Sequence, residues 1–171
     1  KWQLEDLAFR FLQPEVYRRL AKALQQSRTE RIEYLDKFQN ILREALAEEG
    51  VTADVAGRAK HLYSIWRKMQ KKHLEFDELF DVRAVRILVD NVADCYAALG
   101  AVHSRWQYIR GEFDDYIATP KENGYRSLHT AVIGPGGHVV EVQIRTHDMH
   151  NRAELGVAAH WRYKEGRGHD A

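Results

Sequence analysis

Two strand-like segments joined by a glycine-rich turn restrict this chain to folds that contain a β-hairpin. Residues 127–133 and 138–145 are rich in β-branched side chains, and the sequence Gly-Pro-Gly-Gly at 134–137 separates them. The second segment alternates between an apolar face with Val140, Val142 and Ile144 and a polar face with Glu141, Gln143 and Arg145. That polar face is either a solvated sheet surface or the floor of a site.

The length of the hairpin loop decides which residues of the first strand share the polar face. His129 alternates with Leu128 and Thr130 on that strand. An odd number of loop residues places His129 on the same face as Glu141, whereas an even number separates them. The sequence leaves both registers open, and only the odd loop brings a carboxylate, an imidazole and an amide together.

The rest of the chain divides into a helical first third and a mixed remainder. Apolar periodicity predicts helices over residues 3–12, from Pro14 to a break near Ser27, and from there to a stop at Gly50. Beyond it we expect a strand over 51–55, a helix over 60–72, a strand over 83–89, a helix over 94–103, a loop over 111–124 and a last helix over 147–164. This order predicts an α+β (mixed α/β) fold. We expect residues 1–50 to form a helical segment packed on a domain of residues 51–165, with a tail or linker at 166–171.

Charge is nearly balanced in total but segregated along the chain. The 26 Lys+Arg and 25 Asp+Glu residues leave a net charge of +1, which argues against a bulk nucleic-acid binder. Residues 57–73 contain no acid, whereas residues 112–115 read Glu-Phe-Asp-Asp. Such segregation suits a site that holds phosphate with a metal ion, and a solvated helix face beside an acidic loop is the plainer alternative.

Cysteine and hydropathy patterns indicate a cytoplasmic protein without a membrane segment. No apolar run approaches the roughly 20 residues that a membrane span needs, so we expect no membrane partner. Cys95 is the single cysteine, which suits a reducing compartment, and its apolar surroundings predict a core thiol. The nine histidines show no zinc-enzyme spacing. The chain starts at Lys1 rather than Met, so we expect it to be part of a longer protein.

Two further positions carry functional residue types, each with a structural alternative. Asp81 stands just before the predicted strand 83–89, where a carboxylate binds Mg²⁺ or simply starts a strand. Tyr125 follows a loop that contains Lys121 and Gly124. Its ring either stacks on a nucleobase while the lysine meets a phosphate, or anchors the loop onto the core.

Five segments, taken together and in order, resemble the synthetase domain of RelA/SpoT-type alarmone synthetases. They are residues 57–65, 80–86, 123–130, 140–146 and 158–161. The resemblance covers nearly the whole chain and implies a nucleotidyltransferase-like fold, a mixed sheet flanked by helices. It also implies a GTP diphosphokinase activity of the stringent response. Enzymes of this type transfer the β,γ-pyrophosphate of ATP to the 3′-hydroxyl of GDP or GTP, giving (p)ppGpp and AMP.

The resemblance also implies roles for individual residues. On the ATP side, Arg58 matches an arginine that stacks on adenine and meets phosphates, Lys60 and Ser64 match phosphate contacts, and Arg86 is a further phosphate contact. Asp81 and Glu141 match the residues that hold Mg²⁺, and Glu141 also matches the carboxylate that activates the 3′-hydroxyl. On the acceptor side, Tyr125 matches the tyrosine stacked on guanine, with Lys121, Asn123, His129, Gln143 and Asp114 around the same nucleotide.

The acidic segment at residues 112–115 separates subtypes of this family. Its E-x-D-D form resembles monofunctional, RelA-like synthetases, and an R-x-K-D form goes with bifunctional synthetase/hydrolases. The acidic form predicts an altered magnesium demand or an altered preference between GDP and GTP. Ribosome and tRNA contacts are expected through other domains of the full-length protein.

Two other hypotheses about the function of the chain stay open. One is a catalytically silent nucleotide-binding regulatory domain of the same fold, which the presence of Asp81 and Glu141 disfavours. The other is an RNA- or ribosome-binding module that uses the basic stretch at 57–73, which the near-zero net charge disfavours.

Overall fold

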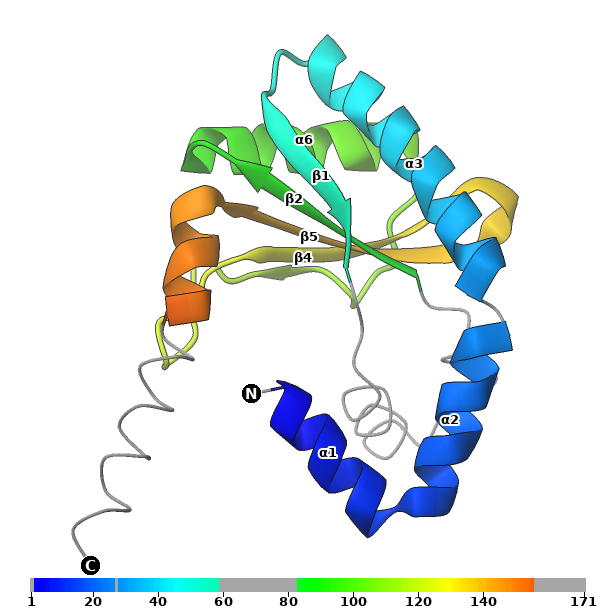
Figure 1. The fold of residues 1–171 in the computed structure, drawn as a ribbon. Coiled ribbons are helices and arrows are strands. Elements are labelled where there is room, and N and C mark those ends of the chain that lie inside the picture. The colour runs from blue at the N-terminus through cyan, green and yellow to red at the C-terminus, as the bar shows by residue number, and fades with distance from the viewer. Residues whose placement is uncertain (1, 27, 59–82, 156–171) are drawn as a thin grey trace, which may run out of the picture.

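A mixed five-stranded sheet with helices on one face forms the centre of the computed structural model, which describes residues 2–26, 28–58 and 83–155 (Figure 1). The helices are α1 (Trp2–Leu12), α2 (Pro14–Gln26), α3 (Arg28–Glu48) and α6 (Val92–Arg105), with a 3₁₀ turn η1 (Pro135–Gly137) and a helix over residues 147–155. The strands are β1 (Ala53–Gly57), β2 (Arg83–Val89), β3 (Asp114–Asp115), β4 (Leu128–Ile133) and β5 (Val139–Thr146).

The sheet has the strand order β1-β2-β5-β4-β3, with β5 in the middle. β2 and β5 run parallel, and every other neighbouring pair is antiparallel. A parallel pair needs a crossover, and α6 lies in the segment that joins these two strands. Asn91 caps α6 by accepting a hydrogen bond from the backbone N–H of Asp94 at 2.9 Å.

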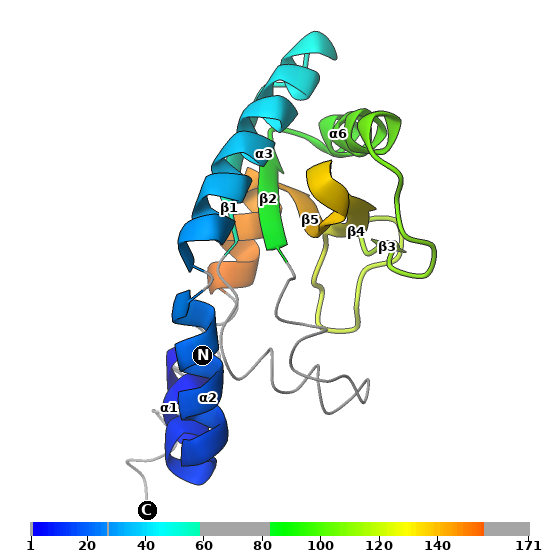
Figure 2. The same cartoon turned by 90° about the vertical axis from the view of Figure 1, so that its right-hand side faces the viewer.

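The core lies between the sheet and the helices α3 and α6, which contact each other and share one face of the sheet (Figures 1 and 2). The apolar residues of β2, β4 and β5 point into it, and α3 and α6 supply the opposite wall. Its fully buried members include Phe38, Leu42, Val85, Ile87, Cys95, Val102, Leu128, Val132, Val140 and Ile144. The other face of the sheet carries the polar residues of β5 together with Ala84 of β2 and Ala131 of β4.

The N-terminal helices follow the sequence-based expectations closely. α2 begins at Pro14, and α3 ends before Gly50, whose φ of 70° and hydrogen bond to Ala47 close a Schellman-type turn. In the same turn the N–H of Val51 still bonds to Leu46, so β1 begins at Ala53 rather than at Val51 as expected. α3 packs on the sheet, whereas α1 and α2 extend beyond its edge (Figure 2).

The later elements differ from expectation mainly at their ends. β2 matches the predicted strand 83–89, α6 is longer than the predicted 94–103 at both ends, and β4 and β5 each start one residue late. The loop expected over 111–124 contains a two-residue strand, β3, which exists through its pairing with β4. The predicted helix 60–72 lies outside the described residues. No described helix is long and apolar enough to cross a bilayer.

Candidate active site

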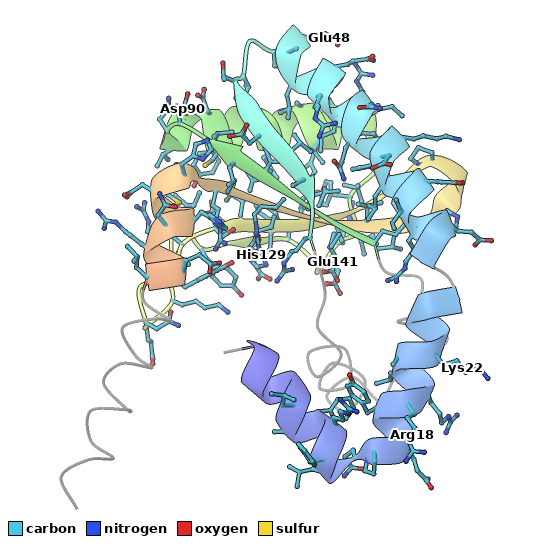
Figure 3. The ribbon with its side chains drawn as sticks, viewed as in Figure 1. Arg18, Lys22, Glu48, Asp90, His129 and Glu141 are labelled. Carbon is cyan, nitrogen blue, oxygen red and sulfur yellow. The ribbon has the colours of Figure 1, made fainter. Side chains whose placement is uncertain are left out.

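The hairpin between β4 and β5 has the odd loop. Ile133 pairs with Val139, which leaves residues 134–138 as a five-residue connection. His129 therefore lies opposite Gln143, and Ala131 lies opposite Glu141. Because alternate residues of a strand share a face, His129, Gln143 and Glu141 occupy the same side of the sheet. Figure 3 shows His129 and Glu141 on the side away from α6.

The parallel pairing of β2 with β5 adds a cation to this polar face. Arg86 is the register partner of Gln143, and Ala84 is the partner of Glu141. The Nε–H of Arg86 donates to Oε1 of Gln143 at 2.9 Å. Burial and the charges of Arg145 and Arg58 lower the pKa of Arg86.

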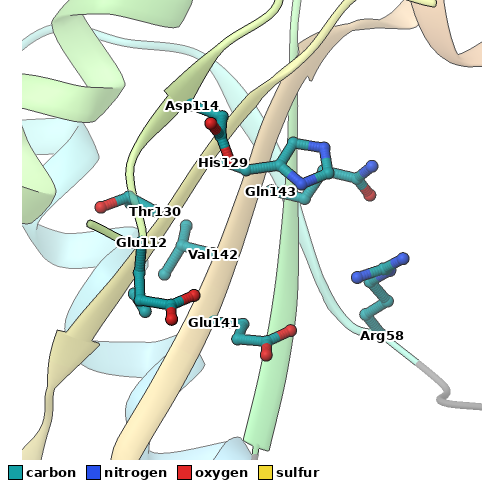
Figure 4. A pocket seen from close by; sticks show the side chains of 9 residues that line it. Arg58, Glu112, Asp114, His129, Thr130, Glu141, Val142 and Gln143 are labelled. Atoms are coloured by element: carbon teal, nitrogen blue, oxygen red, sulfur yellow. The ribbon is translucent and has the colours of Figure 1, made fainter. Parts of the chain in front are cut away.

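One cavity gathers five of the predicted site residues (Figure 4). They are Arg58, Asp114, His129, Glu141 and Gln143, and the lining also includes Glu112, Thr130, Ala131 and Val142. Arg58 follows β1 and is held there by its backbone N–H, which bonds to the carbonyl of Ala84 at 2.9 Å. Strands β4 and β5 and the acidic segment supply the other walls, so residues far apart in the sequence meet at one face.

The acidic segment at residues 112–115 divides into lining residues and an anchor. Asp114 pairs with His129 between β3 and β4, and with Glu112 it lines the cavity. Asp115 instead accepts hydrogen bonds from the N–H groups of Ile117 and Ala118, at 3.0 and 2.8 Å. Partial burial would raise the pKa of Asp115, but these bonds and one from Tyr96 hold it below its ordinary value.

Tyr125 is anchored by its hydroxyl beside the cavity. The hydroxyl oxygen lies 2.7 Å from Nε2 of His129 and accepts a hydrogen bond from Nε2 of Gln143. The Lys121 ammonium lies 5.5 Å from the Tyr125 ring centroid and 4.6 Å from that of Tyr116. The hydroxyl contacts fit the interpretation of Tyr125 as a loop anchor, whereas stacking on a nucleobase stays a prediction.

Asn123 and Arg145 complete the surroundings of Tyr125. Oδ1 of Asn123 accepts a hydrogen bond from the Tyr125 N–H at 3.0 Å, which shapes the loop. Arg145 is buried, with its guanidinium carbon 5.9 Å from the Tyr125 ring centroid, and its Nη2 lies 2.6 Å from Nδ1 of His150. Burial and the neighbouring Arg145 and Arg86 lower the pKa of His150.

His129 is neutral in this setting. Burial, followed by the charges of Arg58 and Lys121, lowers its pKa to about 4, and the carboxylates of Asp114 and Glu141 oppose that shift only in part. At pH 7 the imidazole therefore offers one N–H donor and one acceptor nitrogen.

Three of the predicted site residues lie outside the described residues: Lys60, Ser64 and Asp81. Within the described ranges, no three His, Cys, Asp or Glu side chains form a group that could hold a metal ion. The cavity still offers the carboxylates of Glu112, Asp114 and Glu141. Oxygen donors of this kind fit Mg²⁺, which takes one or two carboxylates together with substrate phosphates.

Sequence reasoning did not single out Tyr116 or assign a role to Arg145. Arg145 carried a signal, because it continues the polar alternation of Glu141 and Gln143, whereas Tyr116 lies in a segment without periodicity. His150 contacts Arg145 by its Nδ1 and is a hydrogen-bonding group. The expected core thiol is confirmed, since Cys95 is fully buried and burial raises its pKa to about 11.

Comparison with known proteins gives a family match and several similar proteins. The family described as "Region found in RelA / SpoT proteins" matches residues 57–168. The GTP pyrophosphokinase of Escherichia coli (strain K12) is 61% identical over 166 residues, which cover 97% of this chain and 22% of that protein. The GTP pyrophosphokinase of Streptomyces coelicolor (strain ATCC BAA-471 / A3(2) / M145) is 51% identical over 165 residues, or 96% of this chain and 20% of that protein.

The chain thus spans about a fifth of the length of these curated relatives. Among solved structures, the small alarmone synthetase 1 from Bacillus subtilis bound to its product pppGpp has the same fold. It matches with a TM-score of 0.63 and 23% identity, over 83% of each chain. The family match covers more than half of the sequence, and the chain belongs to the RelA/SpoT family.

Proposed function

We propose that this chain is a GTP pyrophosphokinase domain, which transfers the β,γ-pyrophosphate of ATP to the 3′-hydroxyl of GDP or GTP and releases AMP. The observation that carries the proposal is a single cavity whose wall contains both the cation Arg58 and the carboxylate Glu141, with His129 and Asp114 beside them. The family match and the activity named for the relatives support it.

Glu141 is the proposed base. A sugar hydroxyl is a weak nucleophile, and a carboxylate within hydrogen-bond reach takes its proton as the bond forms. The 3′-oxygen bonds to the β-phosphorus of ATP, the bond from that phosphorus to the α,β-bridging oxygen breaks, and AMP leaves with the bridging oxygen. β5 holds Glu141 rigidly because it is paired on both sides, by β2 and β4.

Arg58 and Arg86 are proposed to bind ATP, together with Lys60 and Ser64. Phosphoryl transfer depends mainly on positioning and on neutralising the charge of the triphosphate. Arg58 lines the cavity just after β1, and Arg86 lies on β2, which β5 and β4 separate from the acidic segment at β3. These positions support an ATP side at the β1–β2 edge of the site.

The acceptor nucleotide is proposed to bind at the opposite side, where β4 and the loop before it lie. Tyr125 would stack on guanine. The ammonium of Lys121, which lies close to the rings of Tyr116 and Tyr125, would bind a phosphate. Asn123, His129, Asp114 and Gln143 surround the same space in this proposal.

Magnesium is the cofactor that the cavity carboxylates Glu112, Asp114 and Glu141 fit. We propose that Glu141 holds it together with Asp81, and that substrate phosphates complete its coordination. The ion neutralises charge on the transferred group when bound.

Ribosome and tRNA contacts are proposed for other parts of the longer relatives. A cytoplasmic location is also proposed, because the buried Cys95 is a free thiol and suits a reducing compartment.

A direct assay tests the proposal. The chain is mixed with γ-labelled ATP, GDP and Mg²⁺, and the label is expected in ppGpp. Glu141→Gln should lower kcat by at least about 100-fold, the usual contribution of a general base. Glu44→Gln, the same change at an exposed position of α3, should keep the wild-type rate.

Each failure of this assay has a distinct meaning. Nucleotide binding without any labelled product would favour a silent regulatory domain of the same fold. Full activity in Glu141→Gln would refute the assignment of the base. Salt-dependent binding of single-stranded RNA without nucleotide binding would instead favour an RNA-binding module.

A further inference from the structure

Four side chains beneath the proposed acceptor site form a hydrogen-bonded chain that runs from Arg86 through Gln143 and Tyr125 to His129. We infer that Gln143 is a positioning residue that acts through Tyr125 to hold the His129 ring in its Nδ1–H tautomer. The part of this inference that concerns the acceptor nucleotide rests on the proposed function. The tautomer itself follows from the hydrogen-bond chemistry of the four side chains alone.

The first link fixes the orientation of the Gln143 amide. The Nε of Arg86 carries a proton and has no lone pair to accept one, so the atom 2.9 Å away must be the amide oxygen. The NH₂ group of Gln143 then faces Tyr125 at 2.5 Å. Gln143 is buried at 4% exposure, so solvent does not offer its amide an alternative partner.

The second link fixes the proton of the Tyr125 hydroxyl. An NH₂ group only donates, so the Tyr125 oxygen accepts from Gln143. Of the two side chains that the hydroxyl bonds to among the described residues, Gln143 offers no acceptor, whereas an imidazole nitrogen can accept a proton. The hydroxyl proton therefore goes to Nε2 of His129 at 2.7 Å.

The third link sets the tautomer of His129. A nitrogen that accepts the Tyr125 proton must carry a lone pair, so Nε2 is unprotonated and Nδ1 bears the proton of the neutral ring. The groups that face the ring are the cations Arg58 and Lys121 and the carboxylates Asp114 and Glu141. The two nitrogens lie on different edges of the ring, so the Nδ1–H bond points away from the Tyr125 hydroxyl.

This arrangement gives the cavity a hydrogen-bond donor without adding a further positive charge. His129 lines the cavity beside Gln143 and Asp114, as Figure 4 shows. A neutral N–H at this place can bind an oxygen of the acceptor nucleotide. The same chain begins at Arg86 on the proposed ATP side, so Gln143 links the two halves of the site.

Nitrogen NMR of the ring tests the inference without any nucleotide. Protein labelled with ¹⁵N-histidine, at neutral pH, is compared with a His129→Asn sample that identifies the His129 signals. We expect Nδ1 protonated and Nε2 unprotonated in the wild-type protein. A protonated Nε2 would overturn the inference, and the tautomer itself is measured on the unsubstituted protein.

Gln143→Glu should reverse the tautomer. A carboxylate accepts from both neighbours, so the Tyr125 hydroxyl would donate to Glu and its oxygen would accept from Nε2–H of His129. Gln107→Glu, at an exposed position in the loop after α6, is the matched control and should leave the ring signals unchanged. An unchanged Nδ1–H tautomer in a folded Gln143→Glu protein would refute the positioning role.

Kinetics separates this role from a purely structural one. Gln143→Glu keeps the partner of Arg86 and changes the donor offered by His129. We therefore expect the KM for GDP to rise about tenfold, as for one lost hydrogen bond to a charged group, with the KM for ATP nearly unchanged. Equal increases in both KM values would refute the role. An inactive wild-type domain with the Nδ1–H tautomer would instead reject the proposed function alone.

Discussion

The hydroxyl of Tyr96 lies 2.8 Å from Oδ2 of Asp115 and donates a hydrogen bond to it. Tyr96 belongs to α6, on the core side of the sheet, whereas Asp115 ends the acidic segment whose other carboxylates line the cavity. Phe113 of the same segment lies with its ring 6.0 Å from that of His103, also on α6. α6 thus contacts the acidic segment at two points, Asp115 and Phe113.

Loss of this hydrogen bond should loosen the acidic segment. We expect Tyr96→Phe to lower the free energy of unfolding by about 1 kcal/mol, as for a single hydrogen bond, and to weaken the response of the pyrophosphokinase rate to magnesium. Urea unfolding and a magnesium titration measure the two effects. Tyr108→Phe, another exposed tyrosine near α6, is the control. A Tyr96→Phe protein identical to wild type in both measurements would show that the contact has no positioning role.

Reversal of charge in the acidic segment should change the magnesium requirement. Glu112 and Asp114 both line the cavity, so replacing them by Arg and Lys substitutes cations for two carboxylates next to the proposed metal-bound phosphates. The double variant should reach its maximal rate at a lower magnesium concentration.

The control for this double variant carries the same charge change elsewhere. Glu44→Arg with Asp36→Lys alters exposed positions of α3 and should keep the wild-type magnesium curve. Coincident curves for the Glu112/Asp114 variant and the wild-type protein would contradict the role of the acidic segment.

The pKa of His129 predicts a pH dependence of stability. It is about 4 in the folded protein, against 6.5 ordinarily, so the unfolded chain binds the proton more readily between these values. Stability is therefore retained above about pH 6.5 and falls as the pH drops toward 4, by on the order of 3 kcal/mol in full. Between pH 7 and 4.5, urea unfolding should show a smaller loss of unfolding free energy in His129→Gln than in the wild-type protein. Equal losses in the two proteins would count against a role of His129 in this pH dependence.

Two glycines in ordinary solvent-facing positions should respond oppositely to alanine. Gly50 has a φ of 70°, and a Cβ there would meet nothing within 4 Å, so Gly50→Ala should cost about 1 kcal/mol through backbone conformation alone. Gly100 lies inside α6, also without a neighbour within 4 Å of a Cβ, and Gly100→Ala should stabilise by about 0.5–1 kcal/mol. Thermal unfolding of both variants checks the opposite signs. A stabilised Gly50→Ala protein would contradict the backbone argument at Gly50, and a destabilised Gly100→Ala protein would contradict the helix argument at Gly100.

Local patterns were sufficient for most elements of the fold. Pro14 and Gly50 mark real helix boundaries, and the β-branched run at residues 83–89 forms β2 as predicted. β3 was missed because a two-residue strand has no periodicity of its own and depends on its partner β4. The true start of β1 was missed because a helix-terminating hydrogen bond of Val51 competes with the strand.

The candidate site was predicted in part. Arg58, Asp114, His129, Glu141 and Gln143 were singled out from the sequence and its family resemblance, and they line one cavity. The roles assigned to them remain proposals. Lys60, Ser64 and Asp81 lie outside the described residues, so their predicted roles stay predictions.

The sequence by itself determined which strand of the hairpin is polar on one face, because side-chain alternation is a local property of the backbone. It also determined the family, through five ordered segments. Only the tertiary structure decided that His129 shares the face of Glu141, since that depends on a five-residue loop and on a register set by packing against α3 and α6. It alone joined Arg86 to Gln143, 57 residues apart, because parallel pairing is a long-range contact that no local pattern encodes.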